Sequence, residues 1–112
     1  MSKRQFRFSS KTITAEEIDD IMDSAPRGIS YWAGSAVIAD GFPLGDYASE
    51  QISRGGKLRI YDAEGGKSYV LTRAKFLKGM GLFTGDTEPT EIDDPAADTI
   101  IQFALFGEQV YA

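Results

Sequence analysis

Two short apolar segments separated by a pair of glycines constrain the fold more than any other part of the chain. Residues 58–62 and 68–72 are rich in apolar side chains, and Gly65 and Gly66 lie between them. Glycine readily adopts the positive φ angles that a two-residue turn requires, so this pattern predicts a β-hairpin. An antiparallel pair in the middle of the chain argues against a parallel, doubly wound fold.

The expected register of this hairpin pairs Ile60 with Leu71 and Tyr61 with Val70, which places apolar partners together on both faces. Helical patterns lie on both sides of the hairpin. We therefore expect an α+β fold, a small antiparallel sheet with a central hairpin at about 57–72 and three helices. The expected helices span about residues 14–25, 73–84 and 95–106.

The first helix has a clear start signal and a clear stop signal. Thr14 and Glu17 have the spacing of a capping box, and Pro26 and Gly28 are expected to end the helix. Its apolar residues recur at the spacing of one helical face, which predicts that this face is buried. They are Ile18, Ile21, Met22 and Ala25.

The second helix is expected to begin after Thr72, which can act as its N-cap. Gly79 and Gly81 lie within it and weaken the helical pattern, because glycine disfavours helix interiors. Its apolar stripe consists of Phe76, Leu77, Met80 and Phe83.

The third helix is apolar nearly all round. Asp94 followed by Pro95 is typical of a helix start, and Gly107 is expected to end the helix. Phe103 and Phe106 lie roughly opposite its main apolar face, so the helix must be covered on every side. Two arrangements satisfy this: a central helix, or an oligomer contact through Phe103 and Phe106. The main face contains Ala97, Ile100, Ile101, Ala104 and Leu105.

The remaining elements are expected to be short. Phe6 and Phe8 alternate with polar residues, as in a half-buried strand. Further strands are expected at 36–39 and 109–111, and a short helix at about 46–53.

Length and composition limit the classes of protein that are possible. The chain has 112 residues, which fits a single domain spanning 1–112. It contains no Cys and no His, so disulfides, thiolate zinc sites and Ser-His-Asp triads are excluded. No carboxylate spacing predicts a metal site or an acid–base dyad. We expect no enzymatic activity, no metal and no cofactor.

Charge and hydropathy indicate the cellular setting and the kind of partner. The net charge of −5 disfavours direct nucleic-acid binding. There is no secretory signal pattern and no apolar run long enough for a membrane span, so we expect a cytoplasmic protein that does not bind membranes. Acidic residues are concentrated between positions 86 and 98. They are Asp86, Glu88, Glu91, Asp93, Asp94 and Asp98.

One candidate anion site stands out. In Arg54-Gly55-Gly56-Lys57, two glycines lie between two cations, so backbone N–H groups and an arginine fork could grip a phosphate. The same pattern is also typical of a tight turn entering a strand. The nearby aromatic residues Tyr31, Trp32 and Tyr47 could stack a base, or could be core.

Several stretches of the chain resemble a family of small proteins encoded by phages and prophages of gut bacteria. The most specific is Tyr-Ala-Ser-Glu-Gln-Ile-Ser-Arg-Gly-Gly, residues 47–56, supported by residues 69–79 and 98–107. The likeness covers roughly residues 12–112. It implies a phage context and no site residues, and small phage proteins without catalytic groups often counter host defence.

These observations lead to a ranked set of functional hypotheses. The first is an anti-defence protein, expected to be a homo-oligomer, that sequesters a nucleotide-derived immune signal without catalysis. The second is a protein-binding inhibitor of a host defence effector such as a CRISPR nuclease, acting through the acidic stretch 86–98. The third is a structural or assembly role in the phage, with Phe103 and Phe106 as the contact.

Overall fold

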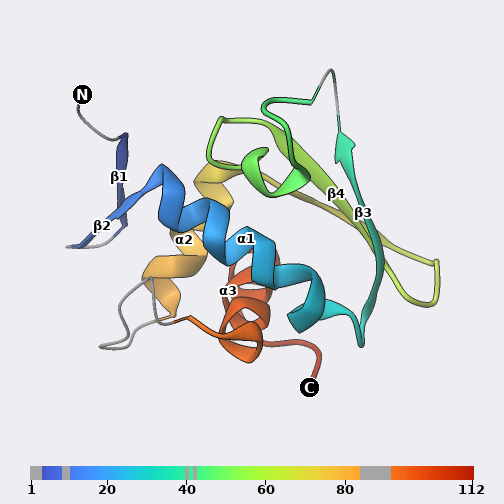
Figure 1. Cartoon of the computed structure of the whole chain (residues 1–112). Coiled ribbons are helices and arrows are strands. Elements are labelled where there is room, and N and C mark those ends of the chain that lie inside the picture. The colour runs from blue at the N-terminus through green and yellow to red at the C-terminus, as the bar shows by residue number, and fades with distance from the viewer. Residues whose placement is uncertain (1–3, 9–10, 40, 42, 84–91) are drawn as a thin grey trace.

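Three antiparallel strands form the larger of two sheets in the computed structural model, which describes residues 4–8, 11–39, 41, 43–83 and 92–112. β3 (Ala33–Ala39), β4 (Lys57–Asp62) and β5 (Ser68–Leu71) are ordered β3-β4-β5 in this sheet. Helices cover one of its faces (Figure 1). The architecture is the α+β fold with three helices that the sequence predicts.

The central hairpin is confirmed, but its register is shifted by two residues from the predicted one. Ile60 pairs with Tyr69, and Leu58 pairs with Leu71. The loop contains four residues, 63–66, because Asp62 organises it. The Asp62 carbonyl accepts from Gly65 N at 3.1 Å and its carboxyl group accepts from Gly66 N at 3.1 Å. The apolar residues still share one face, since a two-residue shift preserves the alternation.

A second, two-stranded sheet pairs β1 (Gln5–Phe8) with β2 (Lys11–Thr14). The strand around Phe6 and Phe8 is therefore confirmed, while its partner strand was not predicted. The Arg73 guanidinium lies 4.5 Å from the centre of the Phe6 ring, a cation–π contact that joins this sheet to the second helix.

Helix α1 (Ala15–Ile29) begins with the predicted capping box but ends later than predicted. Glu17 N donates to the Thr14 hydroxyl at 3.1 Å, and Thr14 N donates to the Glu17 carboxyl group at 2.8 Å. Pro26 lies inside the helix, on its exposed side. The extension to Ile29 is stabilised by packing, since Ile29 is buried in the core. Burial of the Ile29 side chain, worth about 1.5–3 kcal/mol, offsets much of the cost of about 3 kcal/mol that proline imposes on a helix interior.

Helices α2 (Arg73–Leu82) and α3 (Asp94–Phe106) are also confirmed, with small changes at their ends. The N-cap of α3 is Asp93, one residue before the predicted Asp94, and its side chain accepts from Ala96 N at 3.0 Å. α3 contacts α1, α2 and β5, so it is the central helix of the structure.

Two short predicted elements differ in the structure. Residues 109–111 form no strand and instead run along α3. The predicted helix at 46–53 is reduced to the 3₁₀ turn η1 (Ala48–Glu50), followed by further turns. In the part of the chain that the structure describes, no helix is long and apolar enough to cross a membrane.

We predict that Gly79→Ala destabilises the fold, although alanine is the better helix former. A Cβ at Gly79 would lie 2.6 Å from the carbonyl oxygen of Ile100 and 2.8 Å from Ala104 N, so α2 and α3 would have to separate. Such overpacking costs about 1–3 kcal/mol, which exceeds the helix-propensity gain of about 1 kcal/mol.

Urea denaturation followed by circular dichroism measures this change. Gly66→Ala in the hairpin loop is the control for a glycine-to-alanine change at an open position, because no atom lies within 4 Å of a Cβ built there. Equal stability of the two variants would show that the α2–α3 contact is not tight.

Candidate functional site

The Arg54–Lys57 segment forms a turn whose backbone is already hydrogen-bonded. Gly55 N donates to the Ile52 carbonyl at 3.1 Å, and Gly56 N donates to the Gln51 carbonyl at 2.9 Å. Gly55 has a φ of 90°, which favours glycine. Both N–H groups are therefore engaged within the chain, as expected for a tight turn entering β4.

The Arg54 side chain is half exposed and faces an acidic neighbour. Its Nε lies 3.7 Å from the Glu50 carboxyl group. Lys57 is the first residue of β4 and pairs with Ala39 of β3. Neither residue is among those that line the pocket between α1 and the sheet.

The three predicted aromatic residues lie in different environments. Trp32 is a core residue with 3% of its surface exposed, while Tyr31 is 51% exposed and Tyr47 is 71% exposed. Trp32 lies at one end of β4, where its carbonyl accepts from Ala63 N at 2.7 Å. Lys57 marks the other end, and a six-residue strand is roughly 17–20 Å long. The structure therefore does not bring the predicted phosphate turn and Trp32 together.

A polar network that was not predicted fixes Trp32 and Tyr31. Asp98 on α3 is 5% exposed and accepts three hydrogen bonds. The donors are Trp32 Nε1 at 2.8 Å, Tyr31 Oη at 2.6 Å and Gln102 Nε2 at 2.9 Å. The available sequence signal was a pair of polar residues, Asp98 and Gln102, spaced i, i+4 on an otherwise apolar helix.

Gln102 extends this network to the C-terminal segment. Its Oε1 accepts from Val110 N at 2.7 Å and from Tyr111 N at 2.8 Å. The Tyr111 ring then stacks on Trp32, with 4.7 Å between the ring centres and 3° between the planes. The side chain of Gln102 thus replaces the strand pairing that the sequence suggested for this segment.

Phe106 belongs to the same aromatic cluster. Its ring meets Tyr69 edge-on at 4.8 Å and lies 6.0 Å from Trp32. Phe103 is partly buried. The intramolecular packing of Phe106 accounts for one of the two phenylalanines, and an oligomer contact through Phe103 and Phe106 stays a prediction.

Tyr31 and Tyr111 are held in their protonated form. Burial, together with the hydrogen bond to Asp98, raises the pKa of Tyr31. The hydrogen bond with Tyr69, burial and nearby carboxylates raise the pKa of Tyr111 to about 12. Their hydroxyl groups therefore remain protonated at neutral pH and act as hydrogen-bond partners.

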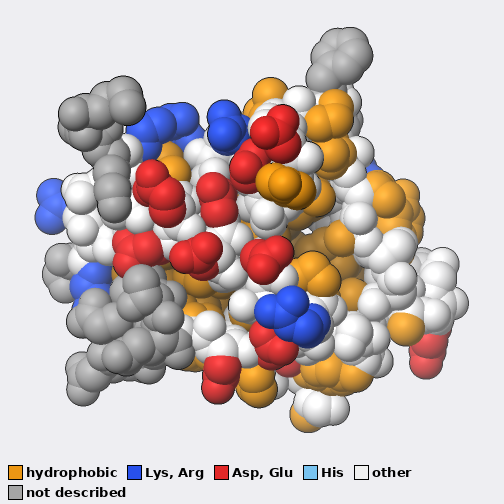
Figure 2. Space-filling view, in the orientation of Figure 1, with side chains coloured by type: hydrophobic (Ala, Val, Ile, Leu, Met, Phe, Trp, Pro, Cys, Tyr) orange, Lys and Arg blue, Asp and Glu red, His pale blue; other side chains and the backbone are white. Residues whose placement is uncertain are grey.

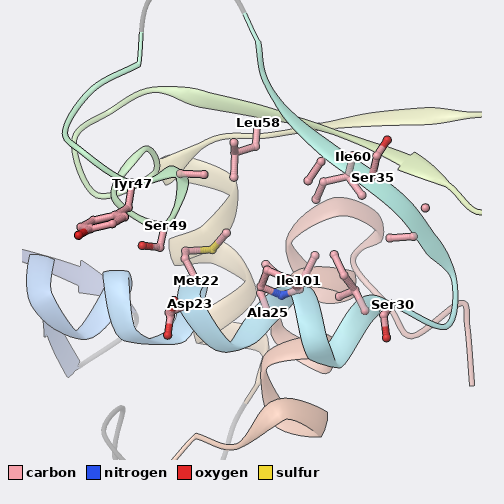
Figure 3. A pocket seen from close by; sticks show the side chains of 16 residues that line it. Met22, Asp23, Ala25, Ser30, Ser35, Tyr47, Ser49, Leu58, Ile60 and Ile101 are labelled. Carbon is pink, nitrogen blue, oxygen red and sulfur yellow. The ribbon is translucent and has the colours of Figure 1, made fainter.

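A pocket of about 510 Å³ lies elsewhere, between α1 and the three-stranded sheet. Figure 3 shows side chains of α1, β3 and β4 pointing into it, with Tyr47 and Ser49 at one side. The β3 side of the pocket has only small side chains, which cannot fill the space between the strand and the helix. They are Ala33, Gly34, Ser35 and Ala36.

The pocket has an apolar floor and a partly polar lining. Met22, Ala25, Ile29, Leu58, Ile60 and Ile101 supply the apolar surface. Tyr47 and Ser49 add hydroxyl groups at one side, whereas the Ser30 and Ser35 hydroxyls point away from the pocket (Figure 3). Asp23 is the one charged residue among the lining residues of the described structure. Of the predicted ligand-binding residues, Tyr47 alone lines this pocket.

An acidic ridge, which we define as Glu16, Asp20 and Asp23, runs along α1 beside the pocket. These three residues are exposed and spaced i, i+4, i+7, so they share one helix face. Figure 2 shows acidic side chains gathered over α1, next to a hollow with apolar surface. Arg27 continues the same helix face four residues after Asp23, and its Nε is paired with Asp94 at 3.1 Å. The surface of α1 beside the pocket is therefore mainly acidic, with this one paired cation at its end.

The predicted acidic stretch 86–98 lies partly outside the described residues. Asp93 caps α3, and Asp94 accepts from Arg27 Nε at 3.1 Å. Asp98 is buried in the network around Trp32. The described acids of this stretch therefore have structural contacts.

Comparison with known proteins identifies no relative: no family model, curated protein or solved structure matches the chain. Within the described residues, no group of three or more acidic side chains is placed to hold a metal ion.

We predict that Asp98→Ala destabilises the fold by about 1–3 kcal/mol, because it leaves the buried Trp32 Nε1 donor without its acceptor, while Gln102 Nε2 keeps the Tyr31 hydroxyl and the Tyr111 carbonyl. Asp98→Asn should cost clearly less, since its amide oxygen can still accept from Trp32 Nε1. Denaturant titration of the two variants measures the difference. Equal losses would show that volume, and not hydrogen bonding, is what Asp98 contributes.

We predict that Asp19→Asn changes the pH dependence of stability. Burial raises the pKa of Asp19 above 3.8, nearby Glu50 adds to the shift, and Ser53 partly opposes it. Its Oδ1 is buried without a hydrogen-bond partner in the described structure. Because the folded-state pKa is raised, the ionised group destabilises the native state above that pKa, and protonation relieves this cost.

The stability gain of Asp19→Asn over the wild type should therefore be largest near neutral pH. It should shrink as the pH falls through the raised pKa and level off below 3.8. Thermal unfolding from pH 3 to pH 7 measures it, with the exposed Asp20→Asn as control. A difference that does not vary with pH would contradict the raised pKa.

Proposed function

We propose that this protein works by binding, without a chemical step, and that the pocket between α1 and β3 is its binding site. The observation that supports this proposal is the pocket itself. Its volume of about 510 Å³ lies within the range of about 300–1,000 Å³ that is usual for small-molecule sites. Its apolar floor and few hydroxyl groups also match the composition of such sites.

The proposed ligand is a nucleotide-derived immune signal of the host, which the protein would sequester. In this proposal an aromatic base enters the pocket beside Tyr47, while the phosphates stay outside it. The pocket floor is apolar and offers no cation to a phosphate, and the exposed Asp23 adds negative charge on the helix side. The phage context implied by the sequence resemblance supplies the anti-defence role, and sequestration requires only tight binding.

Thermal unfolding with a panel of nucleosides and nucleotides tests this function. A ligand at a hundredfold excess over its Kd should stabilise the native state by about 2.7 kcal/mol. Because the phosphates stay outside, a nucleoside should stabilise the protein nearly as well as its nucleotide. Mass spectrometry of small molecules released from denatured protein identifies a ligand that co-purifies.

Two neighbouring substitutions locate the binding site. Ala36→Phe places a large ring in the pocket and should abolish the stabilisation. Val37→Phe, one residue on, is the matched control, because Val37 lies outside the pocket lining and pairs with Arg59 on the opposite face of the strand. Stabilisation that survives Ala36→Phe would contradict the proposed pocket function. So would the absence of stabilisation by every nucleoside and nucleotide tested, together with no small molecule released from the denatured protein.

A further inference from the structure

β3 is an edge strand among the described residues, and its own sequence carries neither of two usual protections of an edge, charge and proline. In the part of the chain that the structure describes, β3 pairs with β4 alone. It contains no charged residue and no proline, and four of its seven residues, 34–37, are exposed. Natural proteins usually block such an edge with charges, proline or a covering loop, because the free N–H and C=O groups can pair with another strand.

The pocket lies directly beside this edge. β3 contributes residues 33–36 to its lining, and α1 forms the opposite wall (Figure 3). A strand that added to β3 would direct every second side chain toward the pocket mouth, since side chains alternate along a strand. The pocket could therefore accept one apolar side chain of an added strand.

The acidic ridge adds a charge preference to the same groove. Asp23 is both a ridge residue and a pocket-lining residue, and it is exposed. On its helix side an occupant meets the carboxylates of Asp20 and Asp23, while the one cation on the same face, Arg27, is already paired with Asp94. Lysine or arginine side chains in the occupant would complement this surface.

We infer that β3 and α1 form a docking groove for an extended, cationic peptide segment of a partner protein. The segment adds as a strand to β3, places an apolar side chain in the pocket and directs basic side chains toward the acidic ridge. This inference rests on the proposed function in one respect: both place an occupant in the groove between α1 and β3. The occupant inferred here is a polypeptide segment.

Charge selects this occupant over a second copy of the chain. Two copies paired through β3 would each bring a net charge of −5, with the acidic ridge close to the shared edge. Like charges across an interface oppose association. A basic partner segment is attracted by the same negative charge. The seven residues of β3 offer it about 23 Å of strand for backbone pairing.

Titration of isotope-labelled protein with two short peptides tests the inference. One peptide alternates lysine with valine over seven residues, and the matched peptide has glutamate in place of lysine. The lysine peptide should shift the backbone amide signals of residues 33–39 and slow their hydrogen exchange. The glutamate peptide should bind at least about tenfold more weakly.

A pair of double variants separates the ridge from general charge. Asp20→Asn with Asp23→Asn should weaken the lysine peptide severalfold, whereas Glu64→Gln with Glu108→Gln, which removes the same charge from other exposed sites, should change its affinity little. Equal weakening by both pairs, equal binding of both peptides, or signal changes that bypass β3 would overturn the inference. So would concentration-dependent dimerisation through β3.

The outcome is separable from that of the ligand panel. Nucleoside stabilisation that Ala36→Phe abolishes, with no binding of the lysine peptide, would leave the proposed function standing and remove the docking groove. If the lysine peptide binds along β3 but no nucleoside or nucleotide stabilises the protein, the docking groove stands and the proposed ligand function is removed.

Discussion

The buried side chain of Asp98 is the interaction on which the rest of this structure depends. It joins three segments that are far apart in the chain: the end of α1 with Tyr31 and Trp32, the middle of α3, and through Gln102 the C-terminal residues. A buried carboxyl group is costly unless it is fully hydrogen-bonded, and here three donors converge on it. The single tryptophan is thereby fixed as a core residue, stacked on Tyr111.

Local signals were sufficient to predict most of the elements. The capping box at Thr14, the glycine pair in the hairpin and the cap region of α3 each depend on residues close in sequence, and each is found in the structure. Errors occurred where distant packing overrides a local tendency. Burial of Ile29 helps to carry α1 past Pro26, and the side chain of Asp62 lengthens the hairpin loop.

The candidate site was harder to predict, because it is a space between α1, β3 and β4 that their side chains do not fill. Arg54, Gly55, Gly56 and Lys57 are adjacent in sequence and suggest a phosphate grip, yet the glycine N–H groups are used by Gln51 and Ile52 within the turn. The pocket instead results from small residues on β3 opposite α1, a relation that no local pattern reveals. Tyr47 is the one predicted residue that lines it.

The same short run of small residues explains both unusual features of β3. Ala36, which pairs with the pocket-lining Ile60, is too small to fill the space against α1, and the whole run 33–36 carries no charge or proline at the strand edge. A larger residue at position 36 would close the pocket. The pocket and the open edge therefore share one short run of β3, and the acidic ridge of α1 gives both the same preference for uncharged or cationic groups.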